Sequence, residues 1–176
     1  LGAYSGAGTI FGATGGVMEA AVRTAYNFVT GENPPEGAVE VTAVRGLEGV
    51  KEGELDIKGT KVRVAVAHGL SNVEAVLNKV REARAEGKET PYHFIEVMAC
   101  PGGCIGGGGQ PYGVHDALRL KRMEGLYEDD RECAQRFSHE NPEIQRIYAD
   151  YLGEPLGEKA HKLLHTRYTA RPLYKQ

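Results

Sequence analysis

The sequence predicts an α/β fold in which a small parallel sheet is followed by a helical C-terminal segment. Two β-prone runs, 61–67 and 92–98, flank a stretch over 71–87 that has the apolar spacing of an amphipathic helix. Strand, helix and strand within this length form a βαβ unit, so we expect the two strands to be parallel. After Pro111 the sequence becomes rich in charged residues, and its apolar spacing predicts helices alone.

The N-terminal part combines a glycine-rich loop with a helix. Residues 2–16 hold six glycines, and the next stretch has helical spacing that begins at a predicted cap, Thr14, and ends at Gly31. The predicted apolar face consists of Val17, Ala20, Ala21, Ala25 and Phe28. A glycine loop that opens a helix is also typical of phosphate sites, but the spacing matches neither the P-loop nor the dinucleotide fingerprint.

The region between this helix and the predicted sheet is less regular. Residues 39–45 form a short β-prone run, and the charged, glycine-containing stretch 46–59 predicts a surface excursion with a hairpin. At the start of the helix over 71–87, Ser71 and Glu74 have the spacing of a capping box.

The C-terminal part is predicted to be helical. Its expected elements are helices over 114–137, from Asn141 and Pro142, and over 158–164, with a tail at 167–176. Asn141 can cap its helix, and Pro142 suits the first helical position. We therefore divide the chain into two predicted segments, 1–113 and 114–176.

Composition excludes several classes of protein. The 176 residues are 41% hydrophobic and 26% charged, which is typical of a globular chain. A net charge of −3 and a pI near 6.1 give no reason to expect nucleic-acid or anionic-membrane binding. No apolar run approaches the roughly 20 residues of a membrane helix. The chain begins without Met and without a signal-peptide pattern, so we expect a piece of a longer polypeptide.

One loop has a composition that points to metal chemistry. The strand over 92–98 delivers Cys100 to its carboxyl end, where ligands bind in open α/β sheets. Seven of the nine residues over 101–109 are Pro or Gly, and Cys104 lies among them. Thiolates select iron–sulfur clusters, Zn or Cu(I), while bare backbone leaves N–H groups free to face anions. The spacing alone is also that of two small buried residues in a turn.

Three cysteines make an odd count and imply no disulfide framework. A metal site in a reducing compartment is the better interpretation, so we expect a cytoplasmic protein. Other candidates have ordinary structural explanations. Cys133 is expected within a helix, Glu19 complements the dipole of its helix, and His68 and His93 are expected to be structural. His161 and His165 have zinc-compatible spacing, but no cysteine or carboxylate accompanies them.

The cysteine loop resembles a known signature. From Glu96 to Pro111 the sequence follows the third cysteine signature of the [FeFe]-hydrogenase catalytic domain, E-x-M-A-C-x-G-G-C followed by G-G-G-Q-P. Residues 5–21 also resemble a segment of that domain. Asn141-Pro142 and the run 163–168 resemble the small-subunit segment, which wraps the catalytic domain as a belt in that family. The resemblance implies the corresponding catalytic lobe and belt.

The resemblance also implies a reaction and a cofactor. The reaction is reversible interconversion of dihydrogen with protons and electrons, at a [4Fe–4S] cubane joined to a di-iron centre with CO, cyanide and dithiolate ligands. By motif position, Cys100 ligates the cubane, Cys104 is the bridging ligand and Met98 contacts the di-iron unit. The residues expected to line or bind the cofactor are Phe11, Gly12, Ala13, Thr14, Gly103, Gln110 and Pro111. Glu96 is a supporting group behind the site or a strand-end charge.

The chain departs from the family in one respect. The family draws its four cubane cysteines from three signatures, and the first two, of the T-S-C-C-P and M-P-C-x-x-K types, are absent here, as is the proton-passing cysteine. The expected partners are therefore the remainder of the catalytic subunit and an electron carrier, either a ferredoxin or a nicotinamide-linked flavoprotein. A non-catalytic iron–sulfur assembly protein and a hydrogen sensor remain as alternatives.

Overall fold

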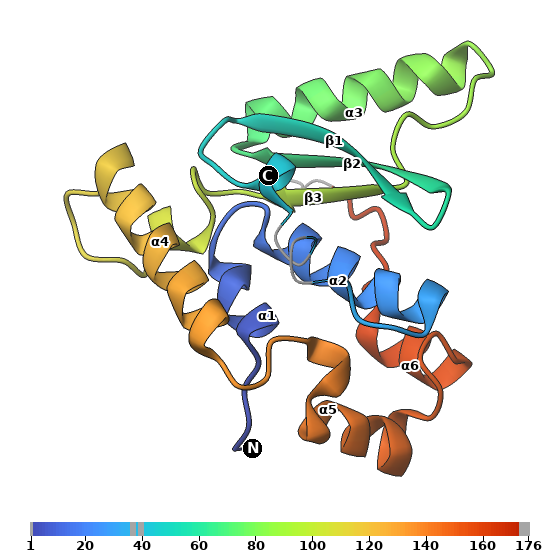
Figure 1. The fold of residues 1–176 in the computed structure, drawn as a ribbon. Helices are drawn as coiled ribbons and strands as arrows, with labels where there is room; N and C mark the ends of the chain where they lie inside the picture. The colour runs from blue at the N-terminus through green and yellow to red at the C-terminus, as the bar shows by residue number, and fades with distance from the viewer. Residues whose placement is uncertain (1, 36–37, 39–40, 173–176) are drawn as a thin grey trace.

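A three-stranded sheet organises the first two-thirds of the chain (Figure 1). The computed structural model describes residues 2–35, 38 and 41–172. The strands are β1 (Val50–Ile57), β2 (Thr60–His68) and β3 (Phe94–Met98), in that order across the sheet. β2 pairs with β3 in parallel, as predicted, and with β1 in antiparallel fashion. The expected hairpin is therefore formed by β1 and β2 together rather than within residues 46–59.

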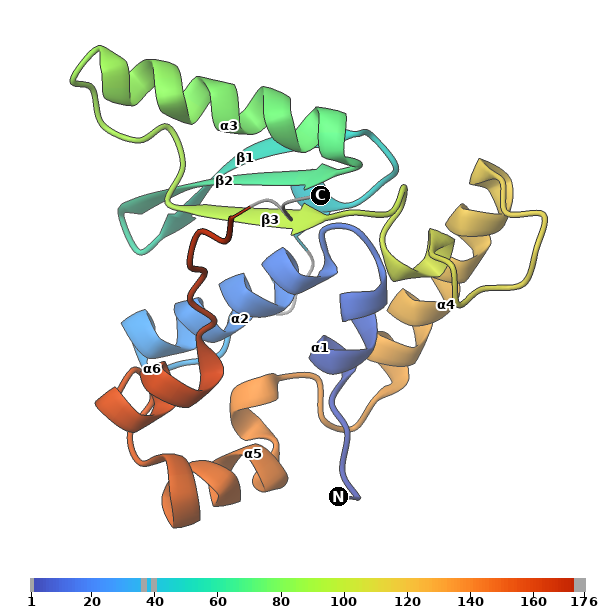
Figure 2. The ribbon, with the colours of Figure 1, turned by 180° about the vertical axis from the view of Figure 1, so that it is seen from behind.

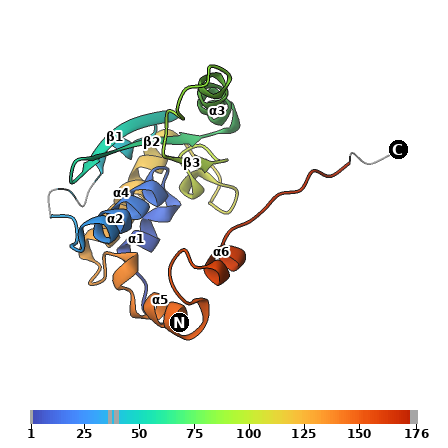
Figure 3. The same ribbon diagram turned by 90° about the vertical axis from the view of Figure 1, so that its right-hand side faces the viewer.

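Helices cover both faces of the sheet (Figures 1 and 3). One face packs against α2 (Gly16–Thr30), in a core formed by Met18, Val41, Val44, Val64 and Val66. The other face packs against α3 (Leu70–Ala85), in a core formed by Ala65, Ala67, Val73, Val76 and Tyr92. Alternate residues of β2 thus enter opposite cores, which explains its nearly continuous apolar sequence.

Two helix starts differ from the predictions. α3 begins after Gly69, which has a φ of 79°, so Ser71 lies inside the first turn and the predicted capping box does not form. α2 begins after Gly15, with a φ of 93°, and the predicted cap Thr14 is fully buried one residue earlier. In both cases a left-handed glycine sets the start, because it turns the chain directly into the helix. The predicted end of α2 at Gly31 is confirmed.

The buried face of α2 also differs from the predicted apolar stripe. Phe28 is 60% exposed, whereas Glu19 and Arg23 are completely or almost completely buried beside Met18 and Ala20. The reason is that the two charged side chains pair with each other at 2.6 Å, which allows their burial. α2 is preceded by the short helix α1 (Gly6–Thr9) and a 3-10 turn over Ile10–Gly12.

The region before β1 contains a 3-10 helix where a strand was expected. Within the predicted run 39–45, residues 39 and 40 lie outside the described residues, and Thr42–Val44 forms the 3-10 helix. Val44 is fully buried against the sheet, so its side chain packs in the core although its backbone does not pair with a strand.

The C-terminal part is helical, as predicted. α4 (Asp116–Glu132) lies beside α1, while α5 (Pro142–Ile147) and α6 (Glu158–Leu164) lie below α2 (Figures 1 and 2). The side chain of Asn141 accepts a hydrogen bond from the N–H of Glu143, so the predicted cap is confirmed. A π-helical turn over Tyr148–Leu152 follows α5. Beyond α6, the described part of the tail extends away from the sheet (Figure 3).

α4 ends five residues earlier than predicted. Cys133 caps its C-terminus in an extended conformation, and so the expectation of a mid-helix cysteine is wrong. The thiol is half-buried and donates to the carbonyl of Gln135 at 3.2 Å, in agreement with a structural role.

Candidate functional site

The cysteine loop is a short, internally bonded turn at the carboxyl end of β3. Gly103 N–H donates to the carbonyl of Cys100 at 3.0 Å, and Gly107 N–H donates to that of Cys104 at the same distance. A Cβ atom on Gly107 would lie 3.4 Å from the Cys100 sulfur, so Gly107 lies directly beside this thiol. Both cysteines are free thiols; Cys104 is exposed and Cys100 is half-buried.

The N-terminal glycine loop lies directly against the cysteine loop. Thr14 N–H donates to the carbonyl of Gly102 at 3.0 Å. Gly103 has a φ of 93°, and a Cβ atom there would lie 2.7 Å from the sulfur of Met98 and 2.8 Å from the carbonyl oxygen of Gly12. The structure therefore brings together four residues that the sequence had assigned to one pocket from separate segments: Gly12, Thr14, Met98 and Gly103.

The other predicted pocket residues are placed less centrally. Ala13 is fully buried in a core with Ile105, so it supports the loop from behind. The side chain of Phe11 is 46% exposed. Gln110 and Pro111 are exposed, and the backbone N–H of Gln110 donates to the carbonyl of Gly107.

Glu96 anchors the start of α2 to the sheet. Its buried carboxylate accepts hydrogen bonds from Gly15 N–H at 2.6 Å and from Met18 N–H at 2.7 Å. Each oxygen atom thus has a backbone donor at the positive end of the helix. Because Met98 follows two residues later on the same strand, Glu96 fixes the glycine loop relative to Met98.

Lys51 is a site-supporting residue that sequence reasoning missed. Lys51 is buried, with only 6% of the residue exposed. Its ammonium donates to the carbonyl of Gly46 at 2.9 Å and to that of Thr14 at 3.3 Å. Burial lowers the pKa of Lys51 from 10.5 to about 8, against the opposing effect of Glu96 and Glu48. The sequence placed Lys51 in a surface excursion, and only the pairing of β1 with β2 brings it beneath the glycine loop.

Two histidines near strand ends have structural partners. His68 is buried, with Nδ1 accepting from Gly102 N–H at 3.2 Å and Nε2 lying 3.1 Å from the carbonyl of Leu47. Nε2 therefore carries the proton, and the ring holds the cysteine loop. His93 accepts from the N–H of Arg63 at 2.9 Å. Neither interaction requires a metal, in agreement with the structural interpretation.

A buried charge network joins α2 to α4. Glu19 pairs with Arg23 and with Arg45, and Arg23 also pairs with Asp130 at 2.8 Å. Burial favours a raised pKa for Asp130, but hydrogen bonds from Arg23 and Arg136 outweigh it and hold this pKa below its ordinary value. Glu19 therefore does more than complement the helix dipole.

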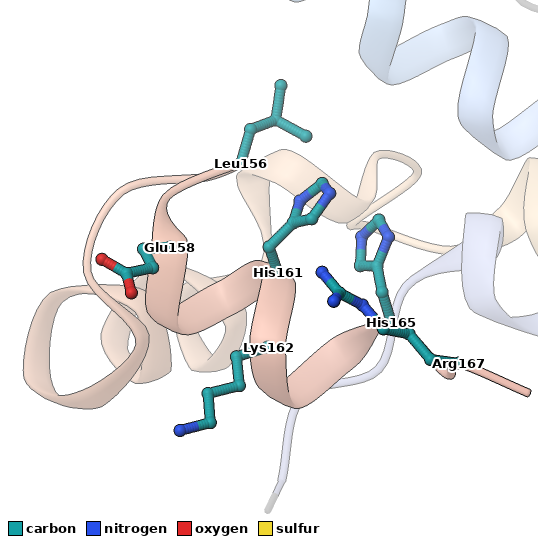
Figure 4. Close-up of a pocket in the computed structure, with 6 residues that line it drawn as sticks. All are labelled: Leu156, Glu158, His161, Lys162, His165 and Arg167. Carbon is teal, nitrogen blue, oxygen red and sulfur yellow. The ribbon is translucent and has the colours of Figure 1, made fainter. Parts of the chain in front are cut away.

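A cavity near α6 is remote from the cysteine loop. It measures about 700 Å³ and is lined by Leu156, Glu158, His161, Lys162, His165 and Arg167 (Figure 4). The two imidazoles stack with their centroids 4.1 Å apart. Glu158 points away from them, so it does not complete a metal site with the pair.

The donor set at the cysteine loop fits part of an iron–sulfur site. Cys100 and Cys104 are thiols on one turn, backed by closely packed backbone and by the Met98 thioether. A cubane needs four ligands, and no cluster of three or more His, Cys, Asp or Glu side chains suited to a metal occurs among the described residues. These residues could therefore hold one side of such a group and not the whole of it.

In the part of the chain that the structure describes, no helix is both long and apolar enough to cross a membrane.

Comparisons with known proteins place both parts of the chain. The model of the iron-only hydrogenase large subunit, C-terminal domain, matches residues 1–108, and that of the iron hydrogenase small subunit matches residues 116–171. The NADP-reducing hydrogenase subunit HndD of Solidesulfovibrio fructosivorans is 48% identical over 172 residues, and iron hydrogenase 1 of Clostridium pasteurianum is 44% identical over 173. These alignments cover 97% and 96% of this chain.

Two further relatives are also similar to this chain. Protein NAR1 of Arabidopsis thaliana is 29% identical over 163 residues, which is 90% of this chain and 33% of that protein. The periplasmic [Fe] hydrogenase large subunit of Nitratidesulfovibrio vulgaris is 50% identical over 120 residues, which is 67% of this chain and 27% of that protein.

The fold agrees with solved structures. A variant of the [FeFe]-hydrogenase HydA1 from Chlamydomonas reinhardtii matches with a TM-score of 0.66 and 41% identity, over 91% of this chain and 46% of that one. The chain spans only 28% of the length of HndD and 29% of the length of iron hydrogenase 1. Both family models and these identities show that the chain belongs to the iron-only hydrogenase family.

Proposed function

We propose that this chain is the C-terminal part of an [FeFe]-hydrogenase catalytic subunit, which interconverts dihydrogen with protons and electrons. The observation that supports this best is the packing of Gly103 against both Met98 and Gly12 at the carboxyl end of β3. Two loops far apart in sequence thereby meet beside the two free thiols. Family membership gives that arrangement its chemical meaning.

Each residue has a proposed role in holding the cofactor. Cys100 would ligate a [4Fe–4S] cubane, and Cys104 would be the ligand shared with a di-iron centre that has CO, cyanide and dithiolate ligands. When bound, this group would supply the redox chemistry that interconverts dihydrogen with protons and electrons. Met98 would contact the di-iron unit through its polarizable sulfur. The residues proposed to line or bind the cofactor are Phe11, Gly12, Ala13, Thr14, Gly103, Gln110 and Pro111.

The chain needs a partner segment for this function. Two thiolates supply half of the four ligands that a cubane requires. We therefore propose that the remaining cysteines and the proton-passing cysteine belong to the rest of the catalytic subunit. We also propose segments 1–113 and 114–176 as the two units of the chain; they share a core in which Ile10 and Ile105 pack against Met123.

The electron carrier and the compartment are also part of the proposal. A ferredoxin or a nicotinamide-linked flavoprotein subunit would exchange electrons with the cluster; the name of the relative HndD, an NADP-reducing hydrogenase subunit, supports the second. Free thiols favour the cytoplasm. One relative is named as periplasmic, so fractionation of the native cells is the direct measurement of the compartment.

A non-catalytic role in iron–sulfur assembly is the second candidate function. The similarity to the cytosolic iron-sulfur assembly component 3 of Mus musculus, which is 32% identical over 164 residues, favours it. Higher identity to the named hydrogenases supports the catalytic function instead. A hydrogen sensor would share the same cluster and differ in its turnover.

The test compares the complete subunit with residues 1–176 alone. Both are reconstituted anaerobically with iron, sulfide and a synthetic di-iron precursor, and hydrogen evolution is assayed with reduced viologen. We expect turnover by the complete subunit and none by the fragment. A complete subunit that binds a cubane without evolving hydrogen would favour the assembly function. Full turnover by the fragment would contradict the claim that essential ligands lie elsewhere.

A further inference from the structure

Helix α4 packs against both loops of the site. Met123 and Tyr127 of α4 lie in one buried core with Ile10 and Ala13 of the first loop and Ile105 of the cysteine loop. α4 lies in the segment that matches the small subunit, whereas both loops lie in the large-subunit match. A helix of the small-subunit segment therefore contacts the residue that directly follows Cys104.

Arg122 makes a polar contact from α4 to the cysteine loop. Its Nη1 donates a hydrogen bond of 2.7 Å to the carbonyl of Ile105, and the side chain is half-buried. A charged donor on a neutral acceptor in a partly buried position gives a strong hydrogen bond. The bond fixes the orientation of the peptide that follows Ile105 and therefore the 3-10 turn that begins at Cys104.

Arg119 lies one turn earlier on the same face of α4 and packs against the loop backbone. A Cβ atom on Gly102 would lie 3.0 Å from its Cδ atom, and one on Gly106 would lie 2.8 Å from its Nε atom. Its Nη1 pairs with Asp116 at 2.5 Å. The Nε atom is buried and has no hydrogen-bond partner among the described residues, although it lies against the turn that holds both cysteines.

We infer that Arg119 and Arg122 are positioning residues for the turn that holds Cys100 and Cys104, and that they bring positive charge close to the backbone of this turn. The effect of that charge on a bound cluster rests on the function proposed above. Hydrogen bonds and net charge around cysteine ligands set the reduction potential of an iron–sulfur group. The small-subunit segment would then influence the cluster through two arginines, in addition to enclosing the catalytic domain.

The positioning role can be tested in the complete subunit without any cluster. The amides of Gly103, Gly106 and Gly107 donate within the turn, so their hydrogen exchange reports its opening. We expect Arg122→Gln to accelerate their exchange by about tenfold, because a charge-assisted hydrogen bond is lost. Arg122→Lys keeps a cationic donor and should restore most of the protection. Lys121→Gln removes an exposed cation from the same helix and is the matched control.

The electrostatic role needs the subunit with its cluster bound. Arg119→Gln should shift the reduction potential of the cubane to a more negative value, since removing a positive charge disfavours the added electron. The CO and cyanide infrared bands should shift in position without any loss in number. Arg119→Lys should restore the wild-type potential, and Lys121→Gln should leave it unchanged.

The outcomes separate this inference from the proposed function. Exchange rates in Arg122→Gln equal to those in Lys121→Gln would overturn the positioning role whether or not a cluster binds. An unchanged potential in Arg119→Gln would overturn the electrostatic role. If the wild-type subunit binds no cluster while Arg122→Gln still accelerates exchange, the positioning role stands and the proposed function is wrong.

Discussion

The sulfur of Met98 lies so close to Gly103 that a Cβ atom on the glycine would be only 2.7 Å from it. This contact joins the end of β3 to the cysteine turn that follows it. It also leaves no room for a side chain between the thioether and the loop. The identity of both residues therefore affects the same small volume, and each can be tested by one substitution.

Gly103→Ala should destabilise the complete subunit by about 2–4 kcal/mol. The new methyl group would meet Met98 and two backbone atoms, and the φ of 93° is unfavourable for alanine. Urea denaturation measures the loss, with Gly108→Ala as a control because a Cβ there contacts nothing within 4 Å. Equal midpoints for the two variants would show that the close packing at Gly103 is incorrect.

Glu96→Gln should cost about 1–3 kcal/mol of stability. The carboxylate accepts two backbone N–H groups, and an amide can accept only one while its NH₂ group faces the other donor. Chemical denaturation of this variant should therefore show a clear loss. Glu74→Gln, on the exposed face of α3, is the matched control. A Glu96→Gln variant as stable as the control would argue for an unimportant strand-end charge.

Met98→Leu should reduce hydrogen turnover more than it reduces stability. The two side chains have similar volumes, so the packing cost should stay under about 1.5 kcal/mol. A substitution beside the reacting metal should lower turnover by about 10–100-fold. Turnover is compared with wild type at matched cluster occupancy, together with thermal denaturation. A large fall in melting temperature with unchanged turnover per cluster would reduce Met98 to a packing residue.

Stability should depend on the pH through Lys51. Its pKa is about 8 in the fold and 10.5 in an ordinary environment, so between these values the unfolded chain binds more protons. The contribution of Lys51 to the free energy of unfolding should therefore rise as the pH rises from 8 to 10.5, and stay constant below that window. The measurement is the difference in unfolding free energy between wild type and Lys51→Met across this range. If this difference in unfolding free energy fell as the pH rose, the environment of Lys51 could not be one that disfavours the charged form.

Local patterns were sufficient to predict β2, β3 and most of the helices, but not the third strand, β1. The alternation of Val64 and Val66 with Ala65 and Ala67 lies within one strand, so the sequence itself shows that both faces are buried. The helix start at Asn141 was predictable for the same reason, because the cap and its partner are two residues apart.

Long-range pairs determined what could not be predicted. Arg23 is buried because Asp130, 107 residues away, pairs with it, and no periodic pattern in α2 contains that information. Lys51 reaches Thr14 only because β1 joins the sheet. The geometry of the candidate site likewise depends on contacts between segments, whereas its residue types followed from a motif within one segment.

The central claim, that Cys104 bridges a cubane to a di-iron centre, is tested most directly by infrared spectroscopy of Cys104→Ser in the complete subunit. A hydroxyl is a poor bridge between soft iron centres, so the di-iron unit should be lost while the fold remains. We predict that the CO and cyanide bands disappear although the far-ultraviolet circular dichroism is unchanged. Bands that persist at wild-type intensity would contradict the account, because the di-iron unit would then be held without the Cys104 sulfur.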